Sequence, residues 1–411
     1  MACVWEETTL EAVCDLITDG AHLSPPSVPI GKPMASVKDL TSFGIRIDSC
    51  RRISEEDFTK LVRQGCQPRK GDVLIAKDGA TALDTVCEVK KNEDVVLLSS
   101  VAILRPNSTL IDSAYLRYYL DASTTRSYLK GSFISGAAIP RVVLKDLKRA
   151  MVRVPPLLVQ RRIAGILSAY DDLIENNLRR IRILEEMARA LYREWFVHFR
   201  FPGHESAPRV ASALGPIPQG WKAKRLDEIA ENFDRLRRPL SKMERAGMQG
   251  EYPYYGAAKV FDYVNNYIFD GEYLLMAEDG SVITTERAPV LQLVNEKFWP
   301  NNHTHVLRGK APVSTHFLFL GLSLVDISPY ITGAAQPKIT QENMNRIPFF
   351  CGPEDLHRDF DRLAAPMIRQ SQVLQRQTAN LRRTRDLLLP QLLSGKALIN
   401  KQQGYENAKN H

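Results

Sequence analysis

Ile134-Ser-Gly-Ala-Ala-Ile-Pro-Arg141 returns later in the chain as Ile331-Thr-Gly-Ala-Ala-Gln-Pro-Lys338. A second stretch, Gly71-Asp-Val-Leu-Ile-Ala-Lys-Asp-Gly79, precedes the first copy, and Gly271-Glu-Tyr-Leu-Leu-Met-Ala-Glu-Asp-Gly280 precedes the second copy at a similar distance. Each half then continues into a long amphipathic stretch. Because self-similarity at a fixed interval marks a repeated structural unit, the sequence predicts a domain followed by a helix, twice.

Length and composition narrow the class of protein. A chain of 411 residues is long enough for two or three domains. Its formal net charge of +8 favours polyanionic partners, although a charged surface also serves solubility. No apolar run approaches the roughly 20 residues needed to span a bilayer, and the cysteines show no Cys-x-x-Cys spacing. We therefore expect a cytoplasmic protein without a membrane segment, a disulfide framework or a zinc site.

Both globular parts combine short β-rich runs with a short helix, which is typical of an α+β domain. Val95–Leu104 and Val290–Val294 are apolar runs closed by turn residues. Pro155-Pro156 ends the first domain, because a proline pair continues neither strand nor helix. The predicted boundaries are a first domain at 1–155, a helical segment at 156–199, a connector at 200–220, a second domain at 221–352, a second helical segment at 353–398 and a polar tail at 399–411.

The helical segments share a heptad pattern in which inward positions alternate by four and three. The first seam is Tyr170, Ile174, Asn177, Ile181, Leu184, Ala188, Leu191 and Trp195. The second seam is Met367, Ser371, Leu374, Thr378, Leu381, Arg385, Leu388 and Leu392. We expect a break at Ser168–Asp171 before the first long helix, with Pro366 as a first helical residue at the matching place. The seams predict an antiparallel coiled coil and a pseudo-twofold relation between the domains. The alternative is that each helix packs only on its own domain.

Catalytic motifs are absent from the sequence. It contains no phosphate-binding loop, dinucleotide fingerprint, zinc-protease motif or nucleophile elbow. His303 and His305 offer two metal ligands without an obvious third, so we expect no metal site. Asp84, Glu88 and Lys90 resemble the carboxylate and Glu-x-Lys set that holds Mg²⁺ beside a scissile phosphate. The second domain lacks a matching set, and an endonuclease is kept as the alternative function.

Basic and aromatic residues near turns are the candidates for DNA contact, because Arg and Lys suit phosphates and guanine edges. In the first domain they are His22, Arg69, Lys70, Lys77 and Arg141. In the second domain they are Tyr254, Tyr255, Lys259, Arg287 and Lys338. Each residue alone also fits a solvated surface. The prediction depends on the duplication, since two related basic modules suit the two halves of a duplex site.

In order and spacing, these motifs resemble the specificity subunit of Type I restriction–modification enzymes over nearly the whole chain. Asp19-Gly-Ala-His-Leu-Ser-Pro25 resembles the start of many target-recognition domains of that family. A signature of the family's second domain is resembled at Tyr254–Ala257, Phe269–Tyr273 and Glu278–Gly280. The two Gly-Ala-Ala elements resemble the exits from the two domains. The helical conserved regions of the family are resembled at Pro155–Gln160 and Leu387–Gly395. Two places depart from the pattern: Gln219-Gly-Trp221 replaces the first motif in the second domain, and Cys351-Gly-Pro353 replaces the double proline.

The resemblance implies an α+β protein with two tandem target-recognition domains and two long helices that form an antiparallel coiled coil. It implies that each domain reads one half of a bipartite site in double-stranded DNA. Through their seam residues, the helices would set the half-site spacing and dock two methyltransferase (M) subunits, and restriction or motor (R) subunits would join through the complex.

It further implies that this chain has no catalytic residue and binds no cofactor or metal. Partner subunits would use S-adenosylmethionine, ATP and Mg²⁺ to methylate adenine and to cleave unmodified DNA. Two other functions remain as alternatives: a self-contained Mg²⁺-dependent DNA endonuclease and a helical interaction protein without a DNA role.

Overall fold

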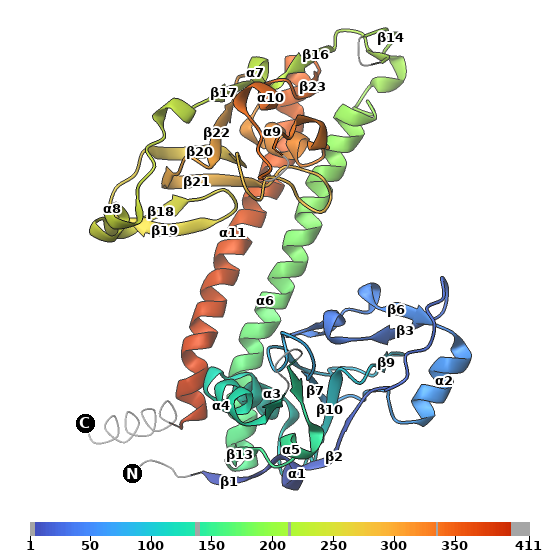
Figure 1. The fold of residues 1–411 in the computed structure, drawn as a ribbon. Coiled ribbons are helices and arrows are strands. Elements are labelled where there is room, and N and C mark those ends of the chain that lie inside the picture. Colours follow the sequence, from blue (N-terminus) through green and yellow to red (C-terminus); the bar gives the residue numbers. More distant parts are fainter. Residues whose placement is uncertain (1–4, 136–139, 213–214, 334–335, 396–411) are drawn as a thin grey trace, which may run out of the picture. The chain divides into compact units, whose positions relative to one another are not determined.

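The computed structural model describes residues 5–135, 140–212, 215–333 and 336–395. The chain divides into two compact units (Figure 1). Unit 1 contains residues 1–178 and 376–411, and unit 2 contains residues 179–375. Each unit therefore combines one globular domain with parts of both long helices. Among the described residues, no helix is long and apolar enough to cross a membrane.

Unit 1 is built on a four-stranded antiparallel sheet in the order β2-β10-β7-β8. Its strands are β2 (Cys14–Asp19), β7 (Val73–Ala76), β8 (Val86–Glu88) and β10 (Val101–Pro106). The smaller strands are β1 (Glu6–Thr9), β3 (Lys32–Ala35), β4 (Leu40–Thr41), β5 (Gly44–Ile45), β6 (Arg51–Ile53), β9 (Val96–Leu97), β11 (Ile134–Ser135), β12 (Arg141–Val142) and β13 (Met151–Val154). The helices are α1 (Leu10–Val13), α2 (Glu55–Arg63), α3 (Ser113–Asp121), α4 (Ser123–Phe133) and α5 (Leu144–Leu147).

Both faces of this sheet are buried. Alternate side chains of a strand point to opposite faces. Val73 and Ile75 belong to a cluster that includes Tyr115 of α3, whereas Leu74 and Ala76 belong to a separate cluster on the other face. Burial on both faces explains why β7 reads as a continuous apolar run instead of an alternating one.

Unit 2 is built on a six-stranded sheet in the order β17-β22-β20-β21-β18-β19. These strands are β17 (Ala230–Asn232), β18 (Gln249–Tyr255), β19 (Val260–Val264), β20 (Phe269–Ala277), β21 (Leu291–Pro300) and β22 (Thr304–Gly309). The smaller strands are β14 (Arg209–Val210), β15 (Ile217–Pro218), β16 (Lys222–Arg225) and β23 (Pro348–Cys351). The helices are α7 (Leu226–Ile229), α8 (Lys242–Gly247), α9 (Thr315–Leu322) and α10 (Gln341–Asn345).

The two sheets share a pairing pattern. In unit 1, β10 pairs with β2 on one side and β7 on the other, both antiparallel. In unit 2, β22 pairs in the same way with β17 and β20. The strand following in each sheet, β8 or β21, again pairs antiparallel with β7 or β20. The repeat predicted from the sequence is therefore a repeat of strand order, and the mixed α+β class is confirmed.

Two long helices follow the domains: α6 (Leu157–Tyr192) and α11 (Glu354–Leu393). The predicted break at residues 168–171 is wrong, because α6 is continuous there. Leu167 and Asp171 are both buried, so packing overrides the local capping signals. Pro366 likewise lies inside α11 instead of beginning a helix. Its side chain is exposed, so the ring needs no space in the core, and its missing N–H leaves one carbonyl without an intrahelical donor.

The two helices pack together and run antiparallel. In unit 1, Arg385 Nη1 lies 2.5 Å from Asp171 Oδ1, and Leu392 shares a core cluster with Ile163. In unit 2, Ser371 Oγ donates to Glu185 Oε1 at 3.0 Å. In unit 1, residues earlier in α6 meet residues later in α11, which defines the antiparallel direction. The pseudo-twofold relation between the two domains stays a prediction.

The predicted seams lie toward the helix partner and the adjoining core. The buried members are Ile174, Asn177, Ala188, Trp195, Ser371, Leu374, Thr378 and Leu392. The half-buried members are Tyr170, Ile181, Leu184, Leu191, Met367, Leu381, Arg385 and Leu388. None of the predicted seam positions is fully exposed, which agrees with a heptad seam.

At the end of α6 the chain makes one π-helical turn, Arg193–Val197, whose Phe196 enters a cluster of aromatic rings in unit 2. His357 of α11 lies in the same cluster, with its ring centroid 4.8 Å from that of Phe317. Neither of its ring nitrogens has a hydrogen-bond partner among the described residues. Burial, and to a smaller extent Lys224, lowers the pKa of His357 from 6.5 to about 4.

This histidine predicts a loss of stability in mild acid. As the pH falls below about 6.5, the unfolded chain binds a proton at His357 that the folded chain does not bind until about pH 4. The free energy of unfolding should therefore fall by roughly 3 kcal/mol across that window. His357→Phe should remove this loss, whereas His198→Gln, at an exposed histidine of the same unit, should not. Urea unfolding at pH 7 and pH 4.5 measures this change in the free energy of unfolding. The same pH dependence in the His357→Phe variant and in the wild type would contradict the prediction.

Candidate nucleic-acid interface

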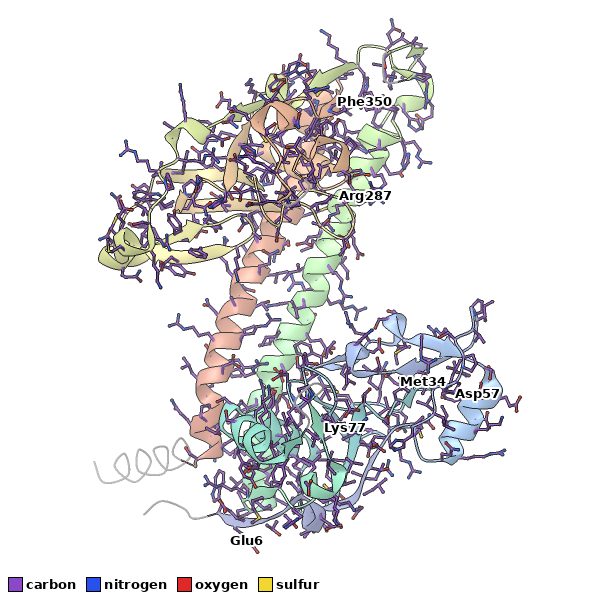
Figure 2. All side chains as sticks on the ribbon, in the orientation of Figure 1. Glu6, Met34, Asp57, Lys77, Arg287 and Phe350 are labelled. Carbon is purple, nitrogen blue, oxygen red and sulfur yellow. The ribbon has the colours of Figure 1, made fainter. Side chains whose placement is uncertain are left out.

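In the first domain, three of the predicted DNA-contact residues meet at the end of β7. Lys77 directly follows this strand and lies at the sheet of unit 1 (Figure 2). Its side chain is buried, with Nζ 3.2 Å from Asp19 Oδ2 and 3.6 Å from Asp78 Oδ1. Lys77 therefore neutralises two carboxylates inside the domain and does not present its charge at the surface.

Arg141 and His22 lie at the surface of the same cluster. Arg141 Nε is 3.1 Å from Asp78 Oδ1, and its side chain is 61% exposed. His22 Nε2 is 3.2 Å from Asp19 Oδ1, and its side chain is 77% exposed. Each side chain is thus oriented by a carboxylate while much of its surface remains accessible, an arrangement that suits contact with phosphate or base edges.

The backbone of this site is a junction between the end of β7 and the exit of the domain. Gly79 N donates to Pro140 O at 2.9 Å, and Val142 N donates to Lys77 O at 2.9 Å. Gly79 has φ of +91°, a conformation that residues with a side chain rarely adopt. The repeated Asp-Gly pair is therefore a turn signal, and the turn closes against the Pro-Arg dipeptide.

The second domain repeats this junction at the end of β20. Gly280 N donates to Pro337 O at 3.1 Å, and its φ is +74°. Ile339 N donates to Glu278 O at 2.9 Å, and Lys338 Nζ lies 3.2 Å from Glu278 Oε1. The two repeated sequence motifs are thus parts of one structural junction. Most of the two Gly-Ala-Ala elements, at 136–139 and 334–335, lies outside the described residues.

The charges inside the second junction differ from those in the first. Glu278 occupies the place of Lys77, and Arg237 supplies the compensating charge, with Nη1 2.8 Å from Glu278 Oε2. Burial favours the neutral acid, but Arg237, His305 and Lys338 together hold the pKa of Glu278 below its usual range. Burial also raises the pKa of Asp234, but His305, whose Nδ1 lies 2.6 Å from Oδ2, together with Val306 N–H and Asn232 holds this pKa below its usual range. Both carboxylates therefore stay ionised.

Three of these residues could in principle form a metal site. Asp234, Glu278 and His305 offer ligand atoms within 4.8 Å of one another. The positive charge among them already comes from Arg237, which also lies 3.5 Å from Asp234. His303 points to another carboxylate, Asp279, at 2.7 Å, so the two histidines do not converge. This arrangement is an ion-pair network, and our expectation of no bound metal stays a prediction.

The remaining predicted basic residues lie on other loops. Arg69 and Lys70 are exposed in the turn before β7, at the opposite end of that strand from Lys77. Lys259 is exposed in the hairpin between β18 and β19, and Thr304 Oγ1 donates to Gly256 O in that hairpin at 3.0 Å. The structure therefore separates Arg69 and Lys70 from the junction of the first domain and brings the hairpin of Lys259 to the start of β22.

Arg287 lies on the loop between β20 and β21 (Figure 2). Its backbone φ is +67°, an uncommon conformation for a residue other than glycine. Its Nε lies 3.2 Å from Asp326 Oδ2 and donates to Ser328 Oγ at 3.0 Å. The guanidinium is exposed and held in one place by the neighbouring loop.

Tyr254 and Tyr255 are core residues. Tyr254 is 2% exposed, and its hydroxyl accepts a hydrogen bond from Leu240 N at 3.0 Å. Tyr255 is also buried, and its hydroxyl donates to Glu296 Oε1 at 2.6 Å. Both rings support the hairpin instead of facing outward, so we do not assign them to DNA contact. The Tyr-Tyr-Gly-Ala motif is explained by packing.

Three residues that the sequence reading did not select are exposed in the second domain. Arg235 and Arg238 lie close in sequence to the half-buried Arg237. Phe261 on β19 is 62% exposed and lies beside Arg245, whose guanidinium is 5.0 Å from the centre of the ring. The basic run Arg235-Leu-Arg-Arg238 could have identified these arginines from the sequence. The exposure of Phe261 could be predicted only once the faces of strand β19 were known.

The residues of the endonuclease alternative engage different partners. Asp84 pairs with Lys130 at 2.5 Å. Glu88 Oε1 accepts a hydrogen bond from Ser113 Oγ at 2.5 Å. Lys90 Nζ lies 2.9 Å from Asp172 of α6. A Mg²⁺-dependent centre needs its carboxylates directed at one ion, and these contacts do not favour one.

The fold and the repeated junctions define a class of protein: two related sheet domains, each joined to a long helix and each with exposed cations beside the same turn. The sequence matches the family described as the Type I restriction modification DNA specificity domain over residues 4–186 and 218–350. The chain belongs to this family, and the resemblance noted from its motifs is confirmed.

Individual relatives agree with this assignment. The chain is 37% identical over 128 residues to a putative type I restriction enzyme specificity subunit of Haemophilus influenzae, a match that covers 31% of this chain and about a third (32%) of that protein. It is 25% identical over 307 residues to the Type I restriction enzyme MjaIX specificity subunit of Methanocaldococcus jannaschii, covering 70% and 69% of the two chains. In fold it is similar to the S subunit of a Type I restriction-modification system from M. genitalium, with a TM-score of 0.65, 16% identity, and 95% and 96% of the chains covered.

Proposed function

We propose that this chain is the non-catalytic DNA-specificity subunit of a Type I restriction–modification complex. Each domain, 1–155 and 221–352, reads one half of a bipartite site in double-stranded DNA. The helices α6 and α11 set the distance between the half-sites. Methylation of adenine and ATP-dependent cleavage belong to partner subunits, which bring S-adenosylmethionine, ATP and Mg²⁺.

The observation that carries this proposal is the repeated junction. Arg141 and Lys338 occupy the same place beside two sheets that share the order of four strands, each exposed beside an Asp-Gly turn. Two equivalent cationic surfaces in one chain suit a target with two parts, as two-fold related proteins suit paired half-sites. The surrounding loops differ between the domains, which fits two different half-site sequences.

Docking of methyltransferase subunits is proposed for the outward faces of the long helices. The seam residues face inward and are largely covered. Ile183 and Met187 of α6 are 45% and 49% exposed and stand one turn apart, and Leu387 of α11 is 60% exposed. Apolar side chains of this size on an exposed helix face are the kind of surface that a partner helix buries.

The test of the proposal is the methylation that the chain directs. Genomic DNA from cells that express this chain with a methyltransferase subunit encoded beside it is sequenced for modified bases. We expect one bipartite adenine motif that is absent when this chain is omitted. A stable complex that yields no such motif would overturn the proposal.

A domain exchange sharpens the test. When residues 1–155 are replaced by the first domain of a related chain, one half-site should change, and the other half-site and the spacer should stay the same. Replacement of residues 221–352 is the matched control and should change only the opposite half. Both halves changing together in either exchange would show that the domains do not read independently.

A further inference from the structure

Asp171 of α6 is a buried carboxylate shared by three partners in unit 1. Arg117 Nη1 lies 2.6 Å from Oδ2, and the hydroxyl of Tyr118 donates to the same oxygen at 2.8 Å. Arg385 Nη1 of α11 lies 2.5 Å from the other oxygen, Oδ1. One side chain thus joins α6 both to α3 of the first domain and to α11.

The charge on Asp171 is kept in spite of its burial. Removal from water by itself raises the pKa of this carboxyl, but Arg117, Arg385 and Tyr118 together hold the pKa below its usual range. Arg117 is also buried. Because an unpaired buried charge is strongly unfavourable, each member of this group depends on the others being in place.

The aliphatic part of the seam discriminates poorly between registers, whereas in unit 2 the rings of Trp195 and Phe196 pack on Phe360 of α11. Leu and Ile side chains of a heptad seam can interdigitate again after a slide of one heptad. Among the described residues, Asp171–Arg385 is the only ion pair that joins α6 to α11. A slide of α11 by one heptad would place Thr378 or Leu392 opposite Asp171 and break the Asp171–Arg385 ion pair.

Polar contacts in unit 2 select the same register. Glu185 of α6 accepts hydrogen bonds from Ser371 Oγ at 3.0 Å and from Gln375 Nε2 at 3.1 Å, both on α11. Asp171 to Glu185 covers two heptads on α6, and Ser371 to Arg385 covers two heptads on α11. The weaker contact in unit 2 thus agrees with the ion pair in unit 1.

The ion pair is not a product of the internal repeat. At the sequence interval of the repeat, Ile368 corresponds to Asp171 and Ala188 to Arg385, and both are buried apolar residues. An apolar pair is therefore compatible with this helix packing. Packing of the two helices therefore does not require the charged group in unit 1. A buried polar group can instead select one register of the helices, and we assign this role to the charged group.

We propose that Asp171, held by Arg117 and Arg385, is a specificity-determining residue for the distance between the two half-sites. It fixes the register of α11 against α6, and a single register gives a single spacer length. This inference rests on the proposed function and adds to it the residues that define the spacing.

The test replaces the group with apolar residues: Asp171→Leu, Arg117→Met and Arg385→Leu together. The triple variant should still fold, because buried ion pairs can be replaced by packed apolar side chains. Modified-base sequencing should then show a second class of sites, displaced in spacer length by about three base pairs for a slide of one heptad. Half-site sequences should not change. Arg382→Leu, at an exposed arginine of α11 in unit 1, is the matched control and should keep one spacer.

A triple variant that methylates sites of the wild-type spacer only would overturn the inference. If the triple variant does not assemble, Arg385→Gln is the second test, because it leaves Asp171 paired with Arg117. It should also give a second spacer length, and Arg385→Lys should restore a single spacer. Wild-type spacing in Arg385→Gln would then overturn the inference. A wild-type chain that directs no bipartite methylation contradicts the proposed function, which is a different outcome.

Discussion

A heptad inserted into each long helix, after Arg180 in α6 and after Arg376 in α11, should lengthen the spacer of the recognised site by about three base pairs. Seven helical residues add about 10 Å, and each base pair adds about 3.4 Å. A heptad also preserves the phase of the seam, so the apolar faces still meet. The half-site sequences should stay the same because neither domain is altered.

Modified-base sequencing measures both properties in one experiment. A four-residue insertion in both helices is the informative control, because it rotates the seam out of phase and should disrupt the helix pair. A heptad inserted in α6 alone should also fail, because it displaces Glu185 from Ser371 or Asp171 from Arg385. If the paired heptad insertion methylates sites with an unchanged spacer, the helices do not set the spacing.

Phe196→Ala should cost about 3–5 kcal/mol of stability. The ring of Phe196 is 1% exposed, and its centroid lies 4.8 Å from that of Phe317 and 5.0 Å from that of Phe360. It therefore joins the end of α6 to α9 and to α11 within unit 2. Truncation leaves a cavity that rigid neighbouring rings fill poorly.

Guanidinium unfolding followed by tryptophan fluorescence reports this loss, and the ring of Trp221 lies 5.5 Å from that of Phe196. Val197→Ala is the matched control, since Val197 is the next residue and is 47% exposed. It should change the free energy of unfolding by less than about 0.5 kcal/mol. A Phe196→Ala variant as stable as the control would show that the aromatic cluster does not hold unit 2 together.

The sequence predicted the long-range plan correctly where the pattern was periodic. Heptad spacing identified both helices and the side chains that face inward, because the seam depends only on position along the helix. The break predicted at residues 168–171 failed because Ser168 and Asp171 look like capping residues locally. The role of Asp171 was decided by the buried Arg117 and the half-buried Arg385, which no local pattern reveals.

The sequence predicted correctly that some of the candidate DNA-contact residues lie at the surface, but not all of them. Arg141, His22 and Lys338 lie at the surface beside the repeated turns, as a basic residue near a turn glycine suggests. Lys77 and Tyr254 have the same sequence context yet are buried. Whether such a residue faces water depends on what packs over it, and residues distant in sequence supply that cover.

By itself, the sequence determined the duplicated α+β plan, the two heptad seams and the family, because each follows from residue order at fixed spacing. Only the tertiary structure decided that Glu278 pairs with Arg237, whereas Lys77 at the equivalent position pairs with Asp19. It also decided that Asp171 joins α6 to both α3 and α11. These pairings join residues far apart in the chain. They arise because a buried charge must find its partner among the side chains that the fold brings close.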